Sequence, residues 1–151
     1  MAAFDPRDAP GHLLRRAQQV HAAVFADVVS AADLTTPQFA VLTALRSEPD
    51  IDQVRLSQRL GIDRSTTADV ANRLEERGLL TRRRDDRDGR RNVLALTRAG
   101  EELHDRTEPE ILEVGERLVA PLTDSDRETL MRCLRAIIAA HDPFFAEQAL
   151  G

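Results

Sequence analysis

The sequence has neither tryptophan nor tyrosine, and phenylalanine contributes only five of its 151 residues. Modules that bind RNA or single-stranded DNA usually stack bases on several aromatic rings. We therefore expect this chain to belong to neither class. Hydrophobic residues make up 42% of the chain and charged residues 31%, which is typical of a globular protein of one domain.

Cysteine is nearly absent as well. The single cysteine, Cys133, cannot form a disulfide within the chain, which fits a reducing compartment such as the cytoplasm. Because Cys133 falls in an apolar stripe at helical spacing, we expect a buried structural thiol rather than a redox sensor.

Long apolar runs and enzyme motifs are also missing. No run approaches the roughly 20 residues that span a bilayer, and the segment MAAFDPRDAPG is no secretory signal, so we expect a cytoplasmic protein without a membrane partner. No glycine-rich phosphate loop, activated nucleophile or carboxylate pair indicates a catalytic residue or a cofactor. The histidines, which lie at His12, His21, His104 and His141, lack metal-ligand spacing, so we expect no metal site.

Basic residues are fewer than acidic residues, but they are concentrated in one segment of the chain. The net charge is −5, and all 21 basic residues are arginines. The segment Val54 to Arg98 nevertheless holds 12 arginines against 7 acidic residues, whereas the rest of the chain holds 9 against 19. Because the location of charge matters more than its sum, this segment is suited to an anionic partner such as DNA.

The two ends of the chain carry apolar stripes at helical spacing. One predicts a helix from about Gly11 to Ala32, broad enough to contact both its own domain and another surface. A later helix is expected to start after Thr97 and to be kinked or split at Pro109. The last apolar stripe predicts a helix that starts at Thr123 to Asp126.

The first part of the central region predicts two helices. Thr36 is expected to be the N-cap of a helix that ends near Ser47, with Pro37 at the first helical position. A third helix is expected over about Gln53 to Leu60, with Val54, Leu56 and Leu60 turned inward.

The second part predicts a recognition-type helix and a hairpin. Gly61 closes the preceding helix, Asp63 caps a helix that runs to about Arg77, and Gly78 ends it. Leu79 to Arg83 and Asn92 to Leu96 have strand character, and an Asp-Gly pair lies between them. The predicted fold class is therefore mainly α with a small β-hairpin (α+β).

The second helix of a helix-turn-helix enters the major groove with its N-terminal residues at the base edges. Asn72 and Arg73 are suited to bidentate contacts with adenine or guanine. An arginine on a narrow hairpin tip can enter a minor groove, and Asp88 can hold Arg90 in place by a bidentate pair. The candidate DNA-contacting residues are Arg64, Ser65, Thr66, Ala68, Asp69, Asn72 and Arg73 on the helix and Arg87, Asp88, Arg90 and Arg91 in the hairpin.

Four segments carry the most specific pattern: Asp63-Arg64-Ser65-Thr66-Thr67, Leu74-Glu75-Glu76-Arg77-Gly78-Leu79-Leu80, Asp88-Gly89-Arg90 and Leu96-Thr97-Arg98-Ala99-Gly100. Together they resemble the MarR family of transcriptional regulators, and the resemblance spans about Leu13 to Ala140. It implies a winged helix-turn-helix in residues 34–98, flanked by dimerisation helices in residues 11–32 and 99–142. It also implies a recognition helix at Arg64 to Arg77 and a wing arginine at Arg90. Asp69 is not a residue that the family pattern predicts.

The resemblance further implies an obligate homodimer that binds a palindromic DNA operator and responds to a small aromatic ligand. Candidate ligand-binding residues are Arg15, Arg16, His21, Phe25 and Phe39. The arginine pair and His21 are similar to those of regulators of aromatic-acid degradation, which implies an aromatic acid or its CoA thioester as the effector of a repressor. Alternatively, the phenylalanines belong to the core, the arginines are solvated or contact a dimer partner, and His21 is a core or interface residue.

A function of another class stays open at this stage. A dimeric winged-helix module that binds only proteins has the same helix pattern and a charged hairpin. Steep loss of affinity for a palindrome as salt rises would distinguish the DNA-binding regulator from such a module.

Overall fold

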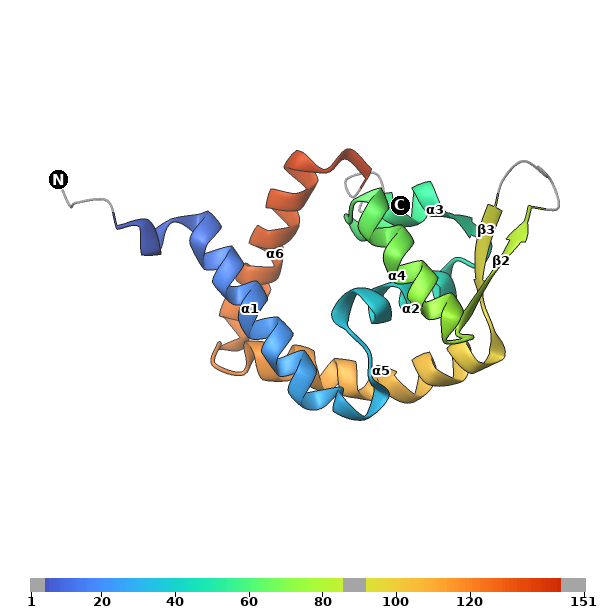
Figure 1. The fold of residues 1–151 in the computed structure, drawn as a ribbon. Helices are drawn as coiled ribbons and strands as arrows, with labels where there is room; N and C mark the ends of the chain where they lie inside the picture. Colours follow the sequence, from blue (N-terminus) through green and yellow to red (C-terminus); the bar gives the residue numbers. More distant parts are fainter. Residues whose placement is uncertain (1–4, 86–91, 145–151) are drawn as a thin grey trace.

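The computed structural model describes residues 5–85 and 92–144. Its elements are η1 (Pro6–Asp8), α1 (Pro10–Val28), η2 (Ser30–Ala32), α2 (Thr36–Ser47), β1 (Ile51–Asp52), α3 (Gln53–Leu60), α4 (Arg64–Glu76), β2 (Leu80–Arg84), β3 (Asn92–Leu96), α5 (Arg98–Val119) and α6 (Asp124–His141). Figure 1 shows α1 and α6 at one end, α2 to α4 and the sheet at the other, and α5 running along both. The predicted fold class is confirmed.

The helix-turn-helix forms as its sequence predicts. Gly61 adopts a left-handed φ of 62° at the end of α3, and the Asp63 side chain accepts a hydrogen bond from the Thr66 amide at 2.9 Å. Gly78 has a φ of 70°, and the Leu79 amide donates to the Leu74 carbonyl at 2.9 Å, which is the bonding pattern of a Schellman cap. Leu79 therefore belongs to the helix end, and strand β2 starts one residue later than expected.

Two expectations for α2 and α3 were wrong. Thr35, not Thr36, is the N-cap of α2: its hydroxyl accepts from the Gln38 amide at 3.4 Å, and the Gln38 side chain accepts from the Thr35 amide at 2.9 Å. A capping box requires Glu or Gln three residues after the cap, and only Thr35 has one. Val54 is 42% exposed because it lies two residues before the fully buried Leu56, roughly 200° around the helix.

The outer helices also differ from their predicted limits. Helix α1 ends at Val28, and the separate turn η2 precedes Asp33, whose φ of 47° is left-handed. Pro109 does not split α5, which continues as one α-helix from Arg98 to Val119. In the described part of the chain, each helix is too short or too polar to serve as a bilayer span.

A three-stranded antiparallel sheet lies beside α4, with the strand order β1-β3-β2. Leu80 is opposite Leu96 at the base of the hairpin, and Arg84 is opposite Asn92 at its far end. The short strand β1 pairs Ile51 with Leu94. The sheet thus fixes the base of the wing against the helix-turn-helix.

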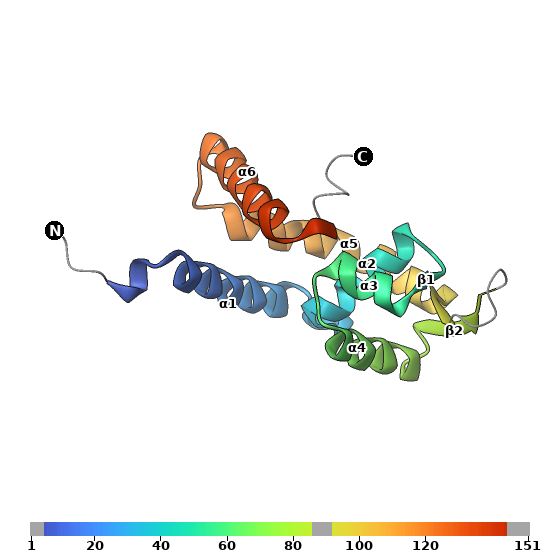
Figure 2. The same cartoon turned by 90° about the horizontal axis from the view of Figure 1, so that it is seen from above.

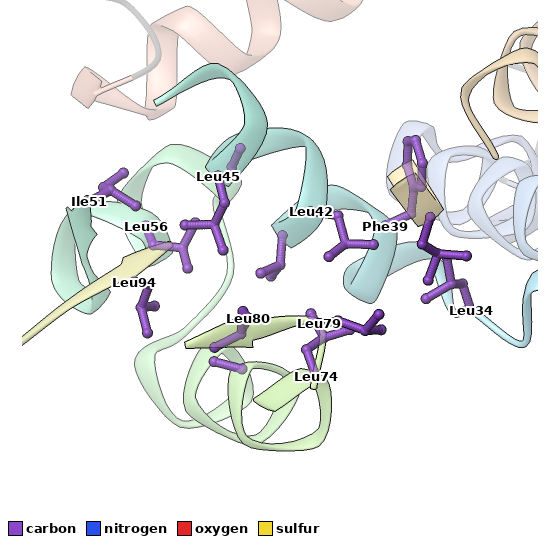
Figure 3. Packing of buried hydrophobic residues seen from close by; sticks show 14 of the residues in the cluster. Leu34, Phe39, Leu42, Leu45, Ile51, Leu56, Leu74, Leu79, Leu80 and Leu94 are labelled. Atoms are coloured by element: carbon purple, nitrogen blue, oxygen red, sulfur yellow. The ribbon is translucent and has the colours of Figure 1, made fainter. Parts of the chain in front are cut away.

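The hydrophobic core is centred on the helix-turn-helix and the sheet (Figure 3). Leucines from α2, α3, α4, β2 and β3 are less than 2% exposed; they are Leu42, Leu45, Leu56, Leu74, Leu80 and Leu94. Burial of one such side chain contributes about 1.5–3 kcal/mol. The core therefore fixes α4 from beneath and leaves its opposite face to solvent.

The helices at the other end are covered on one side only. Helix α6 has no buried residue, and in Figure 2 α1 and α6 extend away from α2 to α4. Large apolar side chains between 37% and 68% exposed lie on α1, α5 and α6; they are Leu13, Leu14, Val20, Leu112, Leu130, Met131, Ile137 and Ile138. An apolar surface of this kind is typical of an interface.

The junction between α4 and α5 joins these two ends. The Thr97 hydroxyl caps α5 by accepting from the Gly100 amide at 3.2 Å, and it donates to the Gly78 carbonyl at 2.6 Å. The Thr97 amide donates to the Leu79 carbonyl at 3.1 Å. The end of α4 and the start of α5 are thus bonded directly to each other.

Candidate DNA interface and ligand cavity

Helix α4 presents a polar outer face that its N-cap fixes firmly. Besides accepting the Thr66 amide, Asp63 accepts the Thr66 hydroxyl at 2.6 Å. These two bonds, the hydroxyl first, hold the pKa of Asp63 below its usual value. On the inner face Thr67, Ala71 and Leu74 are buried, as expected from the helical period.

Most of the predicted DNA-contacting residues of α4 share the outer face. Six of them are exposed; they are Arg64, Ser65, Thr66, Asp69, Asn72 and Arg73, whereas Ala68 is half-buried. A row of small polar groups followed by Asn and Arg can approach base edges closely and donate to them. The hairpin candidates Arg87, Asp88, Arg90 and Arg91 lie outside the described residues, between β2 and β3.

Strand β2 contributes an arginine that the sequence did not single out. Arg82 Nη2 donates to Asn72 Oδ1 at 2.5 Å, and Arg82 Nη1 lies 3.2 Å from Glu75 Oε2. The next arginine, Arg83, instead pairs with Asp50 at 2.7 Å. Both arginines lie in one run of three in the sequence. Only the packing of β2 beside α4 shows which of them contacts that helix.

A largely apolar cavity of about 440 Å³ lies between α1, α5 and α6. Its lining consists of Leu14, Ala17, Gln18 and His21 of α1, Leu118 and Val119 of α5, and Leu130 and Leu134 of α6. The buried Nδ1 atom of His21 has no hydrogen-bond partner among the described residues. The cavity is large enough for a small-molecule ligand, and its otherwise apolar wall contains two polar residues, Gln18 and His21.

The other predicted ligand residues do not line this cavity. Phe25 is 4% exposed in the core, with its ring centroid 6.3 Å from that of His21. Phe39 is 8% exposed and stacks on His104 at 5.2 Å. The exposed Arg15 and Arg16 bond to His12 and Gln19, one turn away or less along α1. Both phenylalanines are therefore core residues, as the alternative interpretation of the sequence expected.

Two larger hollows lie beside the helix-turn-helix. One, of about 640 Å³, is lined mainly by polar residues at the start of α3 and beside it, such as Asp52, Arg55 and Gln58. The other, of about 490 Å³, follows the turn from Gly61 to Arg64. Phe144 lines both. Both are more open than the cavity beside His21, and an open hollow encloses an aromatic ring less well.

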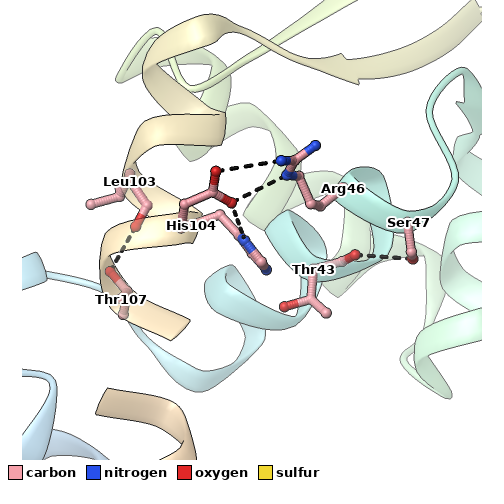
Figure 4. A network of polar contacts seen from close by, with 7 residues as sticks. Thr43, Arg46, Ser47, Leu103, His104 and Thr107 are labelled. Carbon is pink, nitrogen blue, oxygen red and sulfur yellow. Dashed lines mark hydrogen bonds and ion pairs between the residues drawn. The ribbon is translucent and has the colours of Figure 1, made fainter. Parts of the chain in front are cut away.

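A polar network connects α2 to α5 (Figure 4). The Arg46 guanidinium donates to both carboxylate oxygens of Asp105, at 3.2 and 3.4 Å, and Asp105 also lies 3.2 Å from Nδ1 of the buried His104. The bonds from Arg46 and then from His104 hold the pKa of Asp105 below its usual value, and Asp105 raises that of Arg46. No sequence pattern links Arg46 to a residue 59 positions away.

Cys133 departs from expectation. In this single chain its thiol is exposed on α6, a helix with no buried residue. Within residues 5–85 and 92–144, no three His, Cys, Asp or Glu side chains cluster as metal ligands would.

Comparisons with known proteins identify the family. Residues 32–91 match the MarR family. The HTH-type transcriptional repressor NicR of Pseudomonas putida is 31% identical over 135 residues, which cover 89% of this chain and 85% of NicR. The PcaV transcriptional regulator of Streptomyces coelicolor, solved in complex with its natural ligand, is 42% identical with a TM-score of 0.84, over 93% of this chain and 99% of PcaV.

A third similar protein is BpsR of Bordetella bronchiseptica, whose DNA binding is regulated by 6-hydroxynicotinic acid. It is 31% identical with a TM-score of 0.85, over 90% of this chain and 97% of BpsR. These relatives are regulators of transcription rather than enzymes. With its helix-turn-helix, its sheet and similarity over nearly its whole length, the chain belongs to the MarR family of winged helix-turn-helix transcriptional regulators.

Proposed function

We propose that this protein is a homodimeric repressor that binds a palindromic operator and releases it when a small aromatic acid, or its CoA thioester, binds. Residues 34–98 form its DNA-binding part, and the helices in residues 11–32 and 99–142 form its dimerisation part. The observation that carries the proposal is the exposed polar face of α4, which is capped by Asp63 and packed from beneath on the core. Such a protein acts in the cytoplasm, beside the chromosome.

Support for DNA binding comes from the composition of that face and from its surroundings. The face bears Ser, Thr, Asn and Arg side chains, and arginines dominate the strand beside it. DNA binding by this dimer is expected to fall steeply as salt rises, because arginines displace counterions from phosphates. Two half-sites are expected about one helical turn, roughly 34–36 Å, apart.

The test measures affinity for double-stranded DNA by fluorescence anisotropy at several salt concentrations. Arg90→Ala should weaken binding strongly and leave the dimer intact, whereas Arg132→Ala on α6, far from α4 in the chain, serves as a charge-matched control. Unchanged affinity in Arg90→Ala would exclude the wing from the mechanism. Salt-independent or absent binding by the unaltered protein would favour the protein-interaction module instead.

Support for a homodimer comes from the apolar surface of α1, α5 and α6. A free monomer would expose this surface to water, whereas a second copy of the chain presents the same helices and can cover it. Sedimentation equilibrium should therefore give twice the chain mass of 16.8 kDa at micromolar concentration. Ile137→Glu should lower that mass toward the monomer, and a monomeric unaltered protein would refute this part of the proposal.

Support for an aromatic effector comes from the cavity beside His21. A single ring fits within about 440 Å³, and Gln18 and His21, the polar residues in its wall, are the groups that can bond a hydroxyl or carboxylate. The relatives PcaV and BpsR bind a natural ligand and respond to 6-hydroxynicotinic acid, respectively. Of the other predicted ligand residues, Arg15, Arg16, Phe25 and Phe39 do not line this cavity, so His21 is the residue on which this part of the proposal depends.

The corresponding experiment screens hydroxylated benzoates and cinnamates, each as the free acid and as the CoA thioester. An effector should raise the melting temperature by mass action and release DNA. His21→Ala should abolish both effects, whereas His12→Ala, on the same helix but outside the cavity, should keep them. If His21→Ala responds like the unaltered protein, the cavity is not the effector site.

A further inference from the structure

We infer that Arg82 is a positioning residue that sets the base preference of Asn72, and that Asn72 acts as a hydrogen-bond donor to guanine rather than as a reader of adenine. This inference rests on the proposed DNA-binding function of α4. It concerns three side chains from two elements: Asn72 and Glu75 on α4 and Arg82 on β2.

The contact geometry defines which end of the Asn72 amide faces Arg82. A guanidinium has only donors, so the group 2.5 Å from Arg82 Nη2 must be the amide oxygen and not the amide nitrogen. An unrestrained asparagine can rotate its terminal amide by a half turn at little cost. In this protein that rotation would bring the NH₂ group against the guanidinium, where two sets of donors oppose each other.

The guanidinium is itself held in place. Its Nη1 atom lies 3.2 Å from Glu75 Oε2, and its Nε atom is fully buried without a partner among the described residues. The Arg82 side chain is 31% exposed and that of Glu75 is 38% exposed, so both lie partly beneath the surface. Because Glu75 also neutralises its charge, Arg82 is poorly suited to clamp a phosphate and better suited to orient its neighbour.

The consequence concerns the edge of the base that Asn72 can recognise. Bidentate recognition of adenine needs Oδ1 to accept from the N6 amino group while the NH₂ group donates to N7. Arg82 occupies one of the two lone pairs of Oδ1 and places its positive charge beside the other, so an adenine amino group would have to approach next to a cation. The NH₂ group of Asn72 stays available, and guanine offers it two acceptors, N7 and O6.

The alternative is that Arg82 only braces β2 against α4. The two roles make different predictions. Loss of a brace would weaken binding to all DNA sequences alike, whereas loss of a positioning residue would change the preferred base at one position per half-site.

The experiment selects binding sequences from a library of randomised double-stranded DNA and compares the preferred bases. The proteins are the unaltered dimer, Arg82→Ala, Arg82→Met, Asn72→Ala and the Asn72→Ala/Arg82→Ala double variant. Arg82→Met keeps the apolar part of the side chain. An effect shared by both Arg82 variants is therefore not due to lost packing. Arg83→Ala is the matched control, because Arg83 precedes the same hairpin but pairs with Asp50 rather than with α4.

We expect the unaltered protein and Arg83→Ala to prefer guanine at the position that Asn72→Ala identifies. In Arg82→Ala and Arg82→Met the ratio of guanine to adenine should fall by about fivefold or more at that position and stay unchanged elsewhere. In the Asn72→Ala background, removal of Arg82 should have no further effect on base preference.

Two results would overturn the inference. One is an unchanged base preference in both Arg82 variants, whether or not affinity falls. The other is a preference for adenine at that position in the unaltered protein. A library from which the unaltered protein selects no motif at all would instead refute the proposed DNA-binding function, so the two failures can be told apart.

Discussion

Gly100 is the position at which one added methyl group tests the junction between α4 and α5 most directly. A Cβ atom at Gly100 would lie 2.0 Å from the Leu79 carbonyl oxygen and 3.0 Å from its carbon. The oxygen would have to move by about 1 Å to reach even a tight contact. It is fixed, however, because it accepts a hydrogen bond from the Thr97 amide at 3.1 Å.

Whether Gly100→Ala stabilises or destabilises the fold depends on three contributions to the free energy of unfolding. Forcing backbone apart in a packed region costs about 1–3 kcal/mol, and loss of a hydrogen bond at the junction adds about 1 kcal/mol. Replacing a helical glycine by alanine returns at most about 1 kcal/mol. We therefore expect Gly100→Ala to lower the free energy of unfolding by about 1–3 kcal/mol and the melting temperature by about 2–12 °C.

Urea unfolding followed by circular dichroism measures this change, at one fixed protein concentration because the stability of the proposed dimer would depend on it. Gly115→Ala is the control in the same helix. An added Cβ at Gly115 meets nothing within 4 Å, so this variant should be more stable by about 0.5–1 kcal/mol. If Gly100→Ala matched or exceeded the unaltered protein in stability, the close approach of α5 to Leu79 would be refuted.

Three further predictions concern other parts of the fold and use the same unfolding assay. Thr35→Ala should lower the free energy of unfolding by about 1 kcal/mol, whereas Thr36→Ala should be nearly neutral; the reverse order would place the N-cap of α2 at Thr36. Leu42→Ala, at a fully buried site, should cost about 2–5 kcal/mol, and a loss below 1 kcal/mol would contradict its place in the core. Because the pKa of Asp105 is lower in the folded chain, its bond to Arg46 stabilises the fold above the usual carboxyl pKa of 3.8, and this contribution disappears as the pH falls through the lower folded value. Asp105→Asn should therefore flatten the acid side of the stability curve, and an unchanged curve would argue against the bond.

Local chemistry made much of the fold predictable. Gly61, Asp63, Gly78 and Thr97 each define a helix end through bonds to residues no more than five positions away, so their sequence context was sufficient. Thr35 was missed although its partner Gln38 is just as close, because Pro37 drew the N-cap to the adjacent threonine. The limits of α2 and β2 were thus in error by one residue, whereas the end of α1 was predicted four residues too late.

The site was less predictable because its contacts are not local. The outer face of α4 follows from the helical period alone. The bond of Arg82 to Asn72 depends on the register of β2 beside α4, and three consecutive arginines give no sign of which one turns inward. The cavity wall beside His21 combines α1 with α5 and α6, which follow it by about 100 residues, and its location required their packing.

The single uninterrupted helix α5 has a mechanical consequence. Its 22 residues span about 33 Å, from the wing to the turn before α6. If it moves as a rigid lever, a rotation of about 5° at one end displaces the other by about 3 Å, which is close to the roughly 3.4 Å step between base pairs. In the proposed dimer, a tilt that breaks no individual bond can thus put the two halves out of step with DNA by one base pair. The proposed repressor would then be more sensitive to the spacing of the two half-sites than to the strength of individual contacts.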